Sequence, residues 1–311
     1  MSAFDKNCLV ICGPNASGKT SLGVLLAQDF NGEILSADSR QVYQGMDIGT
    51  GKDLHEYSTP RGLVPYHLID ICEPSELYTL YHYQRDFYAA FRDVRSRTKL
   101  PVVVGGTGLY IEAVLKNYHF PNVPENRALR KELMQKNADE LLLQLNRLDS
   151  ALYKSTDKSS KKRVVRSIEI ALYAQDHEIK WSDENPPEIH PLVLAVRWPR
   201  QELHRRIDRR LEERLANGMV QEVETILRSG IPRERFDLFG MEYKHIADYL
   251  DGTVSYGDMT RNLRRAIYQL AKRQETWFRG MQRRGLEINW IDRADPIRAQ
   301  EIVRAERLNL I

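Results

Sequence analysis

Three absences narrow the classes of protein to which this 311-residue chain can belong. No apolar run approaches the ~20 residues that a membrane-spanning helix needs, so we expect no such helix. Residues 1–7 contain no apolar stretch of the kind found in secretory signals, and no segment is repeated or of low complexity. We therefore expect a cytoplasmic protein that has no association with a membrane.

Cysteine is scarce, and the three residues of this type form no pattern that binds a metal. Cys8 and Cys12 lie within or just after an apolar run, Cys72 stands apart, and an odd number cannot pair completely into disulfides. We expect all three to be small buried side chains. The net charge is also low, at +3, but residues 154–166 carry six basic side chains and one acidic side chain. Such a cluster either lies on a solvated helix face or neutralises phosphates.

The rest of the composition is typical of a globular protein. Hydrophobic residues make up 42% and charged residues 29% of the chain, which excludes intrinsic disorder. Helical patterns such as the one over residues 81–95 separate short apolar runs at residues 8–12, 33–36, 66–71, 101–104 and 191–196. Continuous apolar strands that alternate with helices are typical of a parallel sheet buried on both faces. The sequence thus predicts an α/β fold with a parallel-sheet core flanked by helices.

A helical insertion interrupts this pattern. From about residue 122 to residue 180 the sequence is polar with helical spacing and contains no strand candidate, and strands resume only at residue 191. We therefore expect a core formed by residues 1–120 and 190–311 and an insertion domain formed by residues 121–189. Within the core, residues 201–228 and 259–284 read as two long arginine-rich helices.

A phosphate-binding loop (P-loop) follows the first predicted strand and opens a helix. Its residues match the pattern G-x-x-x-x-G-K-[ST]: Gly13, Pro14, Asn15, Ala16, Ser17, Gly18, Lys19 and Thr20. Glycines let backbone N–H groups surround phosphate oxygens, the helix N-terminus and Lys19 add positive charge, and the Thr20 hydroxyl can ligate Mg²⁺. The loop predicts a diphosphate or triphosphate ligand, and the pattern does not distinguish between them.

Polar side chains also follow other predicted strands. Asp38 comes soon after the strand at residues 33–36, and Thr107 stands between glycines after the strand at residues 101–104. Because ligands bind beyond the carboxyl ends of strands in open α/β sheets, we expect Asp38 and Thr107 to share a crevice with the P-loop. Asp70, near the end of the run at residues 66–71, is a further candidate for organising a metal.

Taken in order, these segments resemble the tRNA dimethylallyltransferases, also called tRNA isopentenyltransferases. The resemblance covers nearly the whole chain and rests on residues 13–20, 38–41, 47–50, 67–71, 105–110, 163–169, 218–223 and 271–279. It implies a P-loop core with a helical insertion, which agrees with the patterns above. It also implies transfer of a dimethylallyl group from dimethylallyl diphosphate to N6 of adenine 37 of tRNA, with release of diphosphate and with Mg²⁺ as cofactor.

The resemblance further implies a role for each matching residue. Asp38, Thr107 and Lys19 would be catalytic, with Asp38 as the general base, and residues 13–20 would hold the diphosphate, with Thr20 on the metal. The residues implied to contact tRNA are Asp38, Ser39, Arg40, Gln41, Thr107, Arg127, Lys162, Arg163, Val164, Val165 and Arg166. The resemblance therefore favours a phosphate-binding role for the basic cluster. We expect the enzyme to be a monomer whose partners are the anticodon loop of tRNA and dimethylallyl diphosphate.

The chemistry of this reaction explains why these residue types are needed. Adenine N6 is a poor nucleophile because its lone pair is delocalised into the ring, so a carboxylate must accept a proton as the C–N bond forms. The leaving diphosphate gains negative charge, which Lys19, the loop amides and Mg²⁺ would stabilise. A base in an anticodon loop must also leave its stack to reach the site, so the enzyme must bind the RNA around that base.

Three other functions share some of these features. A free-nucleotide isopentenyltransferase would use the same loop and carboxylate but has no need of an insertion with a basic cluster. In a P-loop kinase of a small metabolite, Asp38 would deprotonate a hydroxyl group and a nucleotide would be required. An RNA-binding NTPase is disfavoured because no clear acidic motor motif accompanies the P-loop.

Overall fold

The computed structural model describes residues 6–179, 181 and 185–306, and the chain divides into two compact units. The first unit comprises Met1–Asn117 and Pro186–Ile311, and the second comprises Tyr118–Asn185. Residues 1–5, on which the expectation about a signal segment partly rests, lie outside the described residues.

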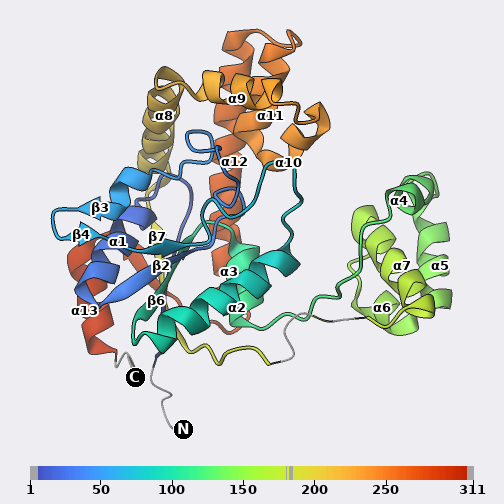
Figure 1. Ribbon diagram of the computed structural model, residues 1–311, viewed down its shortest axis with the longest axis horizontal. Helices are drawn as coiled ribbons and strands as arrows, with labels where there is room; N and C mark the ends of the chain where they lie inside the picture. The colour runs from blue at the N-terminus through green and yellow to red at the C-terminus, as the bar shows by residue number, and fades with distance from the viewer. Residues whose placement is uncertain (1–5, 180, 182–184, 307–311) are drawn as a thin grey trace. The chain divides into compact units, whose positions relative to one another are not determined.

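The first unit is built on a six-stranded sheet in which all neighbouring strands are parallel (Figure 1). The order across the sheet is β5 (Tyr66–His67), β2 (Gly32–Ser36), β6 (Leu100–Gly105), β1 (Cys8–Cys12), β7 (Pro191–Arg197) and β8 (Asn289–Asp292). Every residue of the two central strands, β6 and β1, is buried. The predicted α/β fold with a buried parallel sheet is therefore confirmed.

Helices cover both faces of this sheet. Figure 1 shows α1 (Lys19–Asp29) and α13 (Pro296–Ala305) on one side and α2 (Leu80–Ser96) and α3 (Gly108–Leu115) on the other. Alternate residues of β1 accordingly belong to different cores: Val10 packs with the α2 side and Ile11 with the α1 side. The three cysteines are free and buried, as the sequence predicted.

A separate helical layer follows β7. It consists of α8 (Arg200–Ala216), α9 (Met219–Arg228), α10 (Phe236–Phe239), α11 (Met241–Leu250) and α12 (Tyr256–Arg283), which share a third hydrophobic core. The prediction of one long helix over residues 201–228 was wrong. The chain breaks between α8 and α9 at Gly218, whose φ of 97° lies in the left-handed region that glycine adopts without steric cost.

Two strands also differ from the sequence prediction. The run at residues 66–71 forms a strand only over Tyr66–His67, because the chain then turns with positive φ at Leu68 (66°) and Asp70 (55°). The edge strand β8 was not predicted at all, since the four residues Asn289–Asp292 are too short to show a clear alternation. A small antiparallel hairpin, β3 (Ser58–Thr59) with β4 (Gly62–Leu63), completes the strands of the described residues.

The second unit is helical. Its helices are α4 (Arg127–Leu133), α5 (Ala138–Leu148), α6 (Ser150–Ser155) and α7 (Lys161–Asp176). Val164 and Val165 of α7 are each only 2% exposed and pack with leucines of α4 and α5. The implied contact of these two valines with tRNA is therefore corrected: both side chains hold α7 in the core of its unit.

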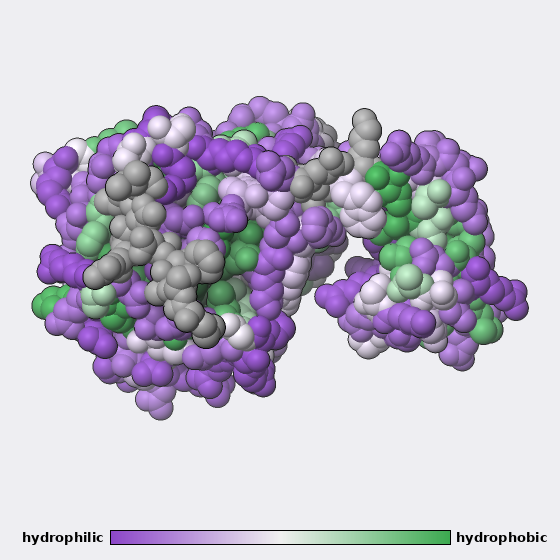
Figure 2. All heavy atoms as spheres, turned by 90° about the horizontal axis from the view of Figure 1, so that it is seen from below, coloured by the Kyte–Doolittle hydropathy of each residue, from purple (hydrophilic) through white to green (hydrophobic). Residues whose placement is uncertain are grey.

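Polar side chains dominate the surface. On the face drawn in Figure 2, hydrophilic residues cover most of the visible surface of each unit and are interrupted by small hydrophobic areas. Among the described residues, no helix has the length and apolar character required to traverse a membrane.

Candidate active site

A cleft of about 1010 Å³ opens beyond the carboxyl ends of β1, β2 and β6. The structure brings together here six of the eight P-loop residues, Asn15 to Thr20, with Asp38 and Thr107. Gly13 and Pro14 lie just behind them and are buried. Three motifs that are far apart in the sequence thus line one cavity, because the strands that carry them are neighbours in the sheet.

The P-loop is anchored from outside through its carbonyl groups. The Trp198 indole N–H donates to the Ser17 carbonyl at 2.9 Å, and Nε of Arg206 donates to the Ala16 carbonyl at 2.7 Å. Gly18 precedes α1 with a φ of 84°, so the loop turns directly into the helix. The N–H groups of the first turn of α1 have no intrahelical acceptors and are therefore available to an anion.

Positive side chains surround this loop. Burial lowers the pKa of Lys19 to about 8; the Asp38 carboxylate opposes that shift, while Arg210 and Arg214 add to it. Arg206, Arg210 and Arg214 recur every four residues along α8, so one face of that helix brings all three to the cleft. The sequence pattern indicated that the arginine-rich helices could add phosphate contacts but did not single out these three arginines, although their regular spacing is visible in the sequence.

Asp53 connects two of these arginines to the loop that runs from Asp38 to Asp53. Its carboxylate forms ion pairs with Arg210 and, at 3.4 Å, with Arg214. Burial alone would raise the pKa of Asp53, but the two guanidinium groups lower it below its ordinary value. Asp53 therefore stays ionised and holds both arginines at the rim of the anion site.

Asp38 and Thr107 are joined through the backbone at the ends of β2 and β6. The Ser39 N–H donates to the Thr107 hydroxyl at 3.1 Å, and Oδ1 of Asp38 accepts from the Arg40 N–H at 2.9 Å. Gly105 permits this approach, because a Cβ atom there would lie 2.2 Å from the Ala37 carbonyl oxygen. The second carboxylate oxygen of Asp38 has no hydrogen-bond partner among the described residues and can serve a ligand in the cleft.

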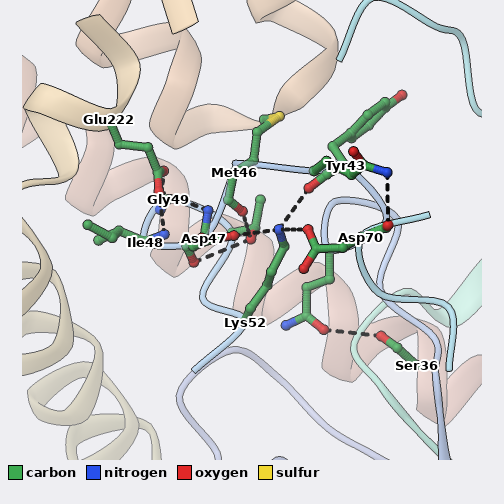
Figure 3. Close-up of polar contacts among 12 residues, drawn as sticks. Ser36, Tyr43, Met46, Asp47, Ile48, Gly49, Lys52, Asp70 and Glu222 are labelled. Carbon is green, nitrogen blue, oxygen red and sulfur yellow. Dashed lines mark hydrogen bonds and ion pairs between the residues drawn. The ribbon is translucent and has the colours of Figure 1, made fainter. Parts of the chain in front are cut away.

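The loop that carries Asp38 continues to residue 53 and is held by a buried lysine. Lys52 is 1% exposed, and its ammonium group contacts the carboxylates of Asp47, at 2.6 Å, and Asp70 (Figure 3). It also donates to the Tyr43 carbonyl at 2.8 Å. The hypothesis that Asp70 organises a metal is therefore corrected: Asp70 pairs with Lys52 and does not line the cleft.

A second anchor of this loop comes from α9. The carboxylate of Glu222 accepts the backbone N–H groups of Asp47, Ile48 and Gly49 at 2.8, 2.7 and 2.9 Å (Figure 3). It also accepts the Tyr243 hydroxyl at 2.6 Å. Glu222 lies in residues 218–223, one of the segments on which the family resemblance rests. The sequence did not show that its carboxylate would bind the loop before Asp53.

The remaining residues implied to contact tRNA lie in two places. Ser39, Arg40 and Gln41 line the cleft, and the Gln41 amide donates to the Gly51 carbonyl at 3.0 Å. Arg127, Lys162, Arg163 and Arg166 belong to the second unit. There, Arg127, Lys162 and Arg163 are exposed, whereas Arg166 is half-buried against Glu169 and donates to the Val123 carbonyl at 2.8 Å.

Comparison with known proteins now adds to this geometry. A family model described as IPP transferase matches residues 41–281, more than half of the chain. A protein named tRNA dimethylallyltransferase 1 from Geotalea uraniireducens is 49% identical over 300 residues, which are 96% of this chain and 97% of that one. The chain belongs to the tRNA dimethylallyltransferase family. It is therefore a prenyltransferase enzyme.

Solved structures of this prenyltransferase family have the same fold. The crystal structure of the full-length tRNA isopentenylpyrophosphate transferase from Bacillus halodurans superposes with a TM-score of 0.69, at 30% identity over 97% of both chains. A eukaryotic dimethylallyltransferase described as acting on tRNA gives a TM-score of 0.73 over 96% of this chain and 78% of its own. At 23% identity, the second likeness concerns the fold alone.

Proposed function

We propose that this enzyme transfers a dimethylallyl group from dimethylallyl diphosphate to N6 of adenine 37 in tRNA and releases diphosphate. One observation carries the proposal: a single cleft places an anion-binding P-loop beside a carboxylate with an oxygen left for a ligand. An allylic diphosphate requires the first feature, and an amine that must lose a proton requires the second. Membership in the family and the name of its relative agree with this pairing.

Our proposal assigns the donor to the P-loop side of the cleft. The N–H groups at the start of α1, with Lys19, Arg210 and Arg214, would hold the diphosphate and stabilise the charge that develops as its bond to the allylic carbon breaks. A fixed arrangement of cations does this at no cost of reorganisation during the reaction. No nucleotide is needed, because the donor itself supplies the diphosphate leaving group.

The residues present fit a magnesium ion that is held mainly by the substrate. Thr20 opens α1 and lines the cleft, while the described residues contain no cluster of three His, Cys, Asp or Glu side chains that could cage a metal by themselves. Mg²⁺ is commonly bound by few protein ligands together with substrate phosphates and water. When bound by Thr20 and the diphosphate, the ion would neutralise charge on the leaving group.

Asp38 would receive the adenine. Its oxygen toward the cleft would accept a hydrogen bond from N6–H and then the proton as the C–N bond forms. The same carboxylate would repel the O6 acceptor of a guanine, which gives a reason for selecting adenine. The Thr107 hydroxyl, which lies against the residue that follows Asp38, would stand beside the reacting groups.

We assign the binding of tRNA to the half-buried Arg40 and to three exposed cations of the second unit. Arg40 at the cleft and Arg127, Lys162 and Arg163 of the second unit carry charge that phosphates can neutralise. Arg163 pairs with Asp157 at 2.7 Å, but both side chains are exposed, so a phosphate can replace the carboxylate at little cost. Arg166 is left out of this set, because it binds the buried Glu169.

Incubation of the protein with labelled dimethylallyl diphosphate, Mg²⁺ and unmodified tRNA tests the proposal, with parallel reactions to which adenosine monophosphate or ATP is added. Without ATP, nucleoside analysis should find N6-dimethylallyladenosine, and mapping of labelled oligonucleotides from the tRNA should place it at position 37. Label in free adenosine monophosphate but not in tRNA would instead identify a free-nucleotide transferase, and strict dependence on ATP hydrolysis would identify a kinase.

A further inference from the structure

A buried glutamine of α12 connects two loops of the cleft. Gln274 is 8% exposed, and its Oε1 accepts the backbone N–H of Asn15 in the P-loop at 2.9 Å. Its Nε2 donates to the Gly106 carbonyl at 3.0 Å and to Oδ1 of Asn15 at 3.2 Å. The same amide therefore binds the loop after β1 and the loop after β6.

These loops carry the opposite halves of the reaction. Parallel pairing between β1 and β6 ends at Cys12 and Gly105, and the chains then continue into the P-loop and toward Thr107. Gln274 joins them just beyond the point where the sheet stops. The space there is closely filled, because a Cβ atom on Gly106 would lie 2.4 Å from Nε2 of Gln274.

Docking of α12 does not account for this polar side chain. Buried apolar residues hold the helix along its length, among them Ile267, Ala271 and Phe278 around this position. A buried amide costs free energy unless both its donor and its acceptor are satisfied, so an apolar residue would serve for packing alone. Among the residues that the structure describes, the hydrogen bonds of Gln274 instead go to the two loops of the cleft and to the side chain of Asn15.

We propose that Gln274 is a positioning residue that sets the distance between the bound diphosphate and the Asp38–Thr107 pair. The Gln274 amide holds the P-loop through its hydrogen bonds with Asn15. It holds the peptide that precedes Thr107 through its hydrogen bond to the Gly106 carbonyl. The inference rests on the proposed function, since it concerns the alignment of the allylic carbon with adenine N6. Reacting atoms must approach to about 3–3.5 Å, and a misplacement of ~1 Å can cost about 10²-fold in rate.

The test compares Gln274→Met with a matched variant, Gln84→Met. Both change a buried glutamine to an unbranched side chain of similar length. Gln84 lies on α2, donates to the Ala113 carbonyl at 3.3 Å and does not line the cleft. The measurement is single-turnover prenylation of tRNA with both substrates saturating, because its rate constant reports alignment while its amplitude reports the fraction of folded enzyme.

We expect Gln274→Met to lower the rate constant by about 10- to 100-fold, with the amplitude and the affinities for tRNA and donor changed by less than about threefold. Gln84→Met should lower the melting temperature but keep the parental rate constant. A rate constant of Gln274→Met within about threefold of the parent would overturn the inference, as would a fall in amplitude alone.

A second variant covers the case in which Gln274→Met does not fold. Gln274→Glu keeps an acceptor for the Asn15 N–H but cannot donate to Gly106, and the same fall in rate constant is expected. An unchanged rate constant for this variant would also overturn the inference. Failure of the parent enzyme to prenylate tRNA would refute the proposed function and not the positioning role, so the two failures are distinguishable.

Discussion

Lys19 has a lowered pKa because it is buried beside other cations. Burial disfavours its charge and is the largest cause of the lowered pKa; the Asp38 carboxylate opposes the shift, and Arg210 and Arg214 add to it. A bound diphosphate would oppose this shift, since it would bring negative charge next to the Lys19 ammonium group. Binding of the donor and protonation of Lys19 should therefore be linked.

We predict that affinity for dimethylallyl diphosphate falls as pH rises above about 8, the folded-state pKa of Lys19. Below that pH the ammonium group is charged and binds the diphosphate; above it the proton is lost and the attraction disappears. The dissociation constant should rise by up to about tenfold per pH unit between pH 8 and 9.5. Direct binding measurements with the parent and with Lys19→Met check this, because the variant should bind weakly at every pH. A parental affinity that stays constant to pH 9.5 would contradict the assignment.

Residues within a local motif were predictable, and residues that support them from a distance were not. Lys19 and Thr20 follow from eight consecutive residues, and Asp38 and Thr107 follow from their places after apolar strands. Gln274 contacts Asn15 across 259 positions of the chain, and Glu222 contacts Asp47 across 175. No local pattern encodes such a contact, because it depends on how α9 and α12 pack against the sheet.

At the scale of elements, the segment from Asp38 to Asp53 depends on its anchors. It contains no helix or strand, so its backbone groups depend on turns within the segment and on partners from other parts of the chain. Glu222 satisfies the N–H groups of Asp47, Ile48 and Gly49 together. The geometry of the segment that begins at Asp38 therefore depends on a carboxylate from α9.

We expect Glu222→Leu to destabilise the protein by about 1–3 kcal/mol, because three N–H groups and the Tyr243 hydroxyl lose their acceptor. Glu224→Leu, at a neighbouring position of the same helix, removes only an exposed pair with Arg228 and should cost less than about 1 kcal/mol. Urea unfolding measures both. Amide hydrogen exchange should also accelerate at Asp47, Ile48 and Gly49 in Glu222→Leu alone. Equal destabilisation of the two variants, with unchanged exchange, would show that Glu222 is not an anchor.

Element types were easier to predict than element ends. The apolar runs of β1, β2, β6 and β7 are continuous because their strands are buried on both faces, and this gives a clear signal. The break between α8 and α9 had a local signal in Gly218, but helical spacing on both sides obscured it. The turn after β5 depends on Lys52, which binds Asp70 from another part of the chain.

At the scale of the whole molecule, the two units divide the work of the proposed reaction. Every residue that lines the cleft belongs to the first unit, and the basic cluster belongs to the second. The sequence predicted a helical insertion from the absence of strand patterns. It did not predict which side chains of the basic cluster face solvent. The exposed Lys162 and Arg163 are followed directly by the buried Val164 and Val165 and the half-buried Arg166, and the sequence pattern does not separate them.

We predict that Lys162→Ala combined with Arg163→Ala weakens tRNA binding and reduces its salt dependence, by ~0.7 to 0.9 in slope for each phosphate that is no longer neutralised. Affinity for dimethylallyl diphosphate should not change. Arg298→Ala combined with Arg304→Ala is the matched control, because it removes two exposed cations of α13 that do not line the cleft. Filter binding over a range of salt concentrations gives both slopes. Identical salt-dependence slopes for the two double variants would show that the basic cluster does not bind tRNA and is a solvated helix face.

The central claim is that one cleft aligns a diphosphate leaving group with an amine whose proton passes to Asp38. Asp38→Asn tests it most directly, because the amide keeps the size of the side chain and one acceptor oxygen, which can bind the Arg40 N–H or an amine, but it cannot take the proton. In single-turnover prenylation with saturating tRNA and donor, the account predicts a fall of about 10²- to 10⁴-fold in the rate constant with binding and melting temperature nearly unchanged. A rate constant within about threefold of the parent would contradict the account and leave Asp38 as a structural cap for the turn that follows it.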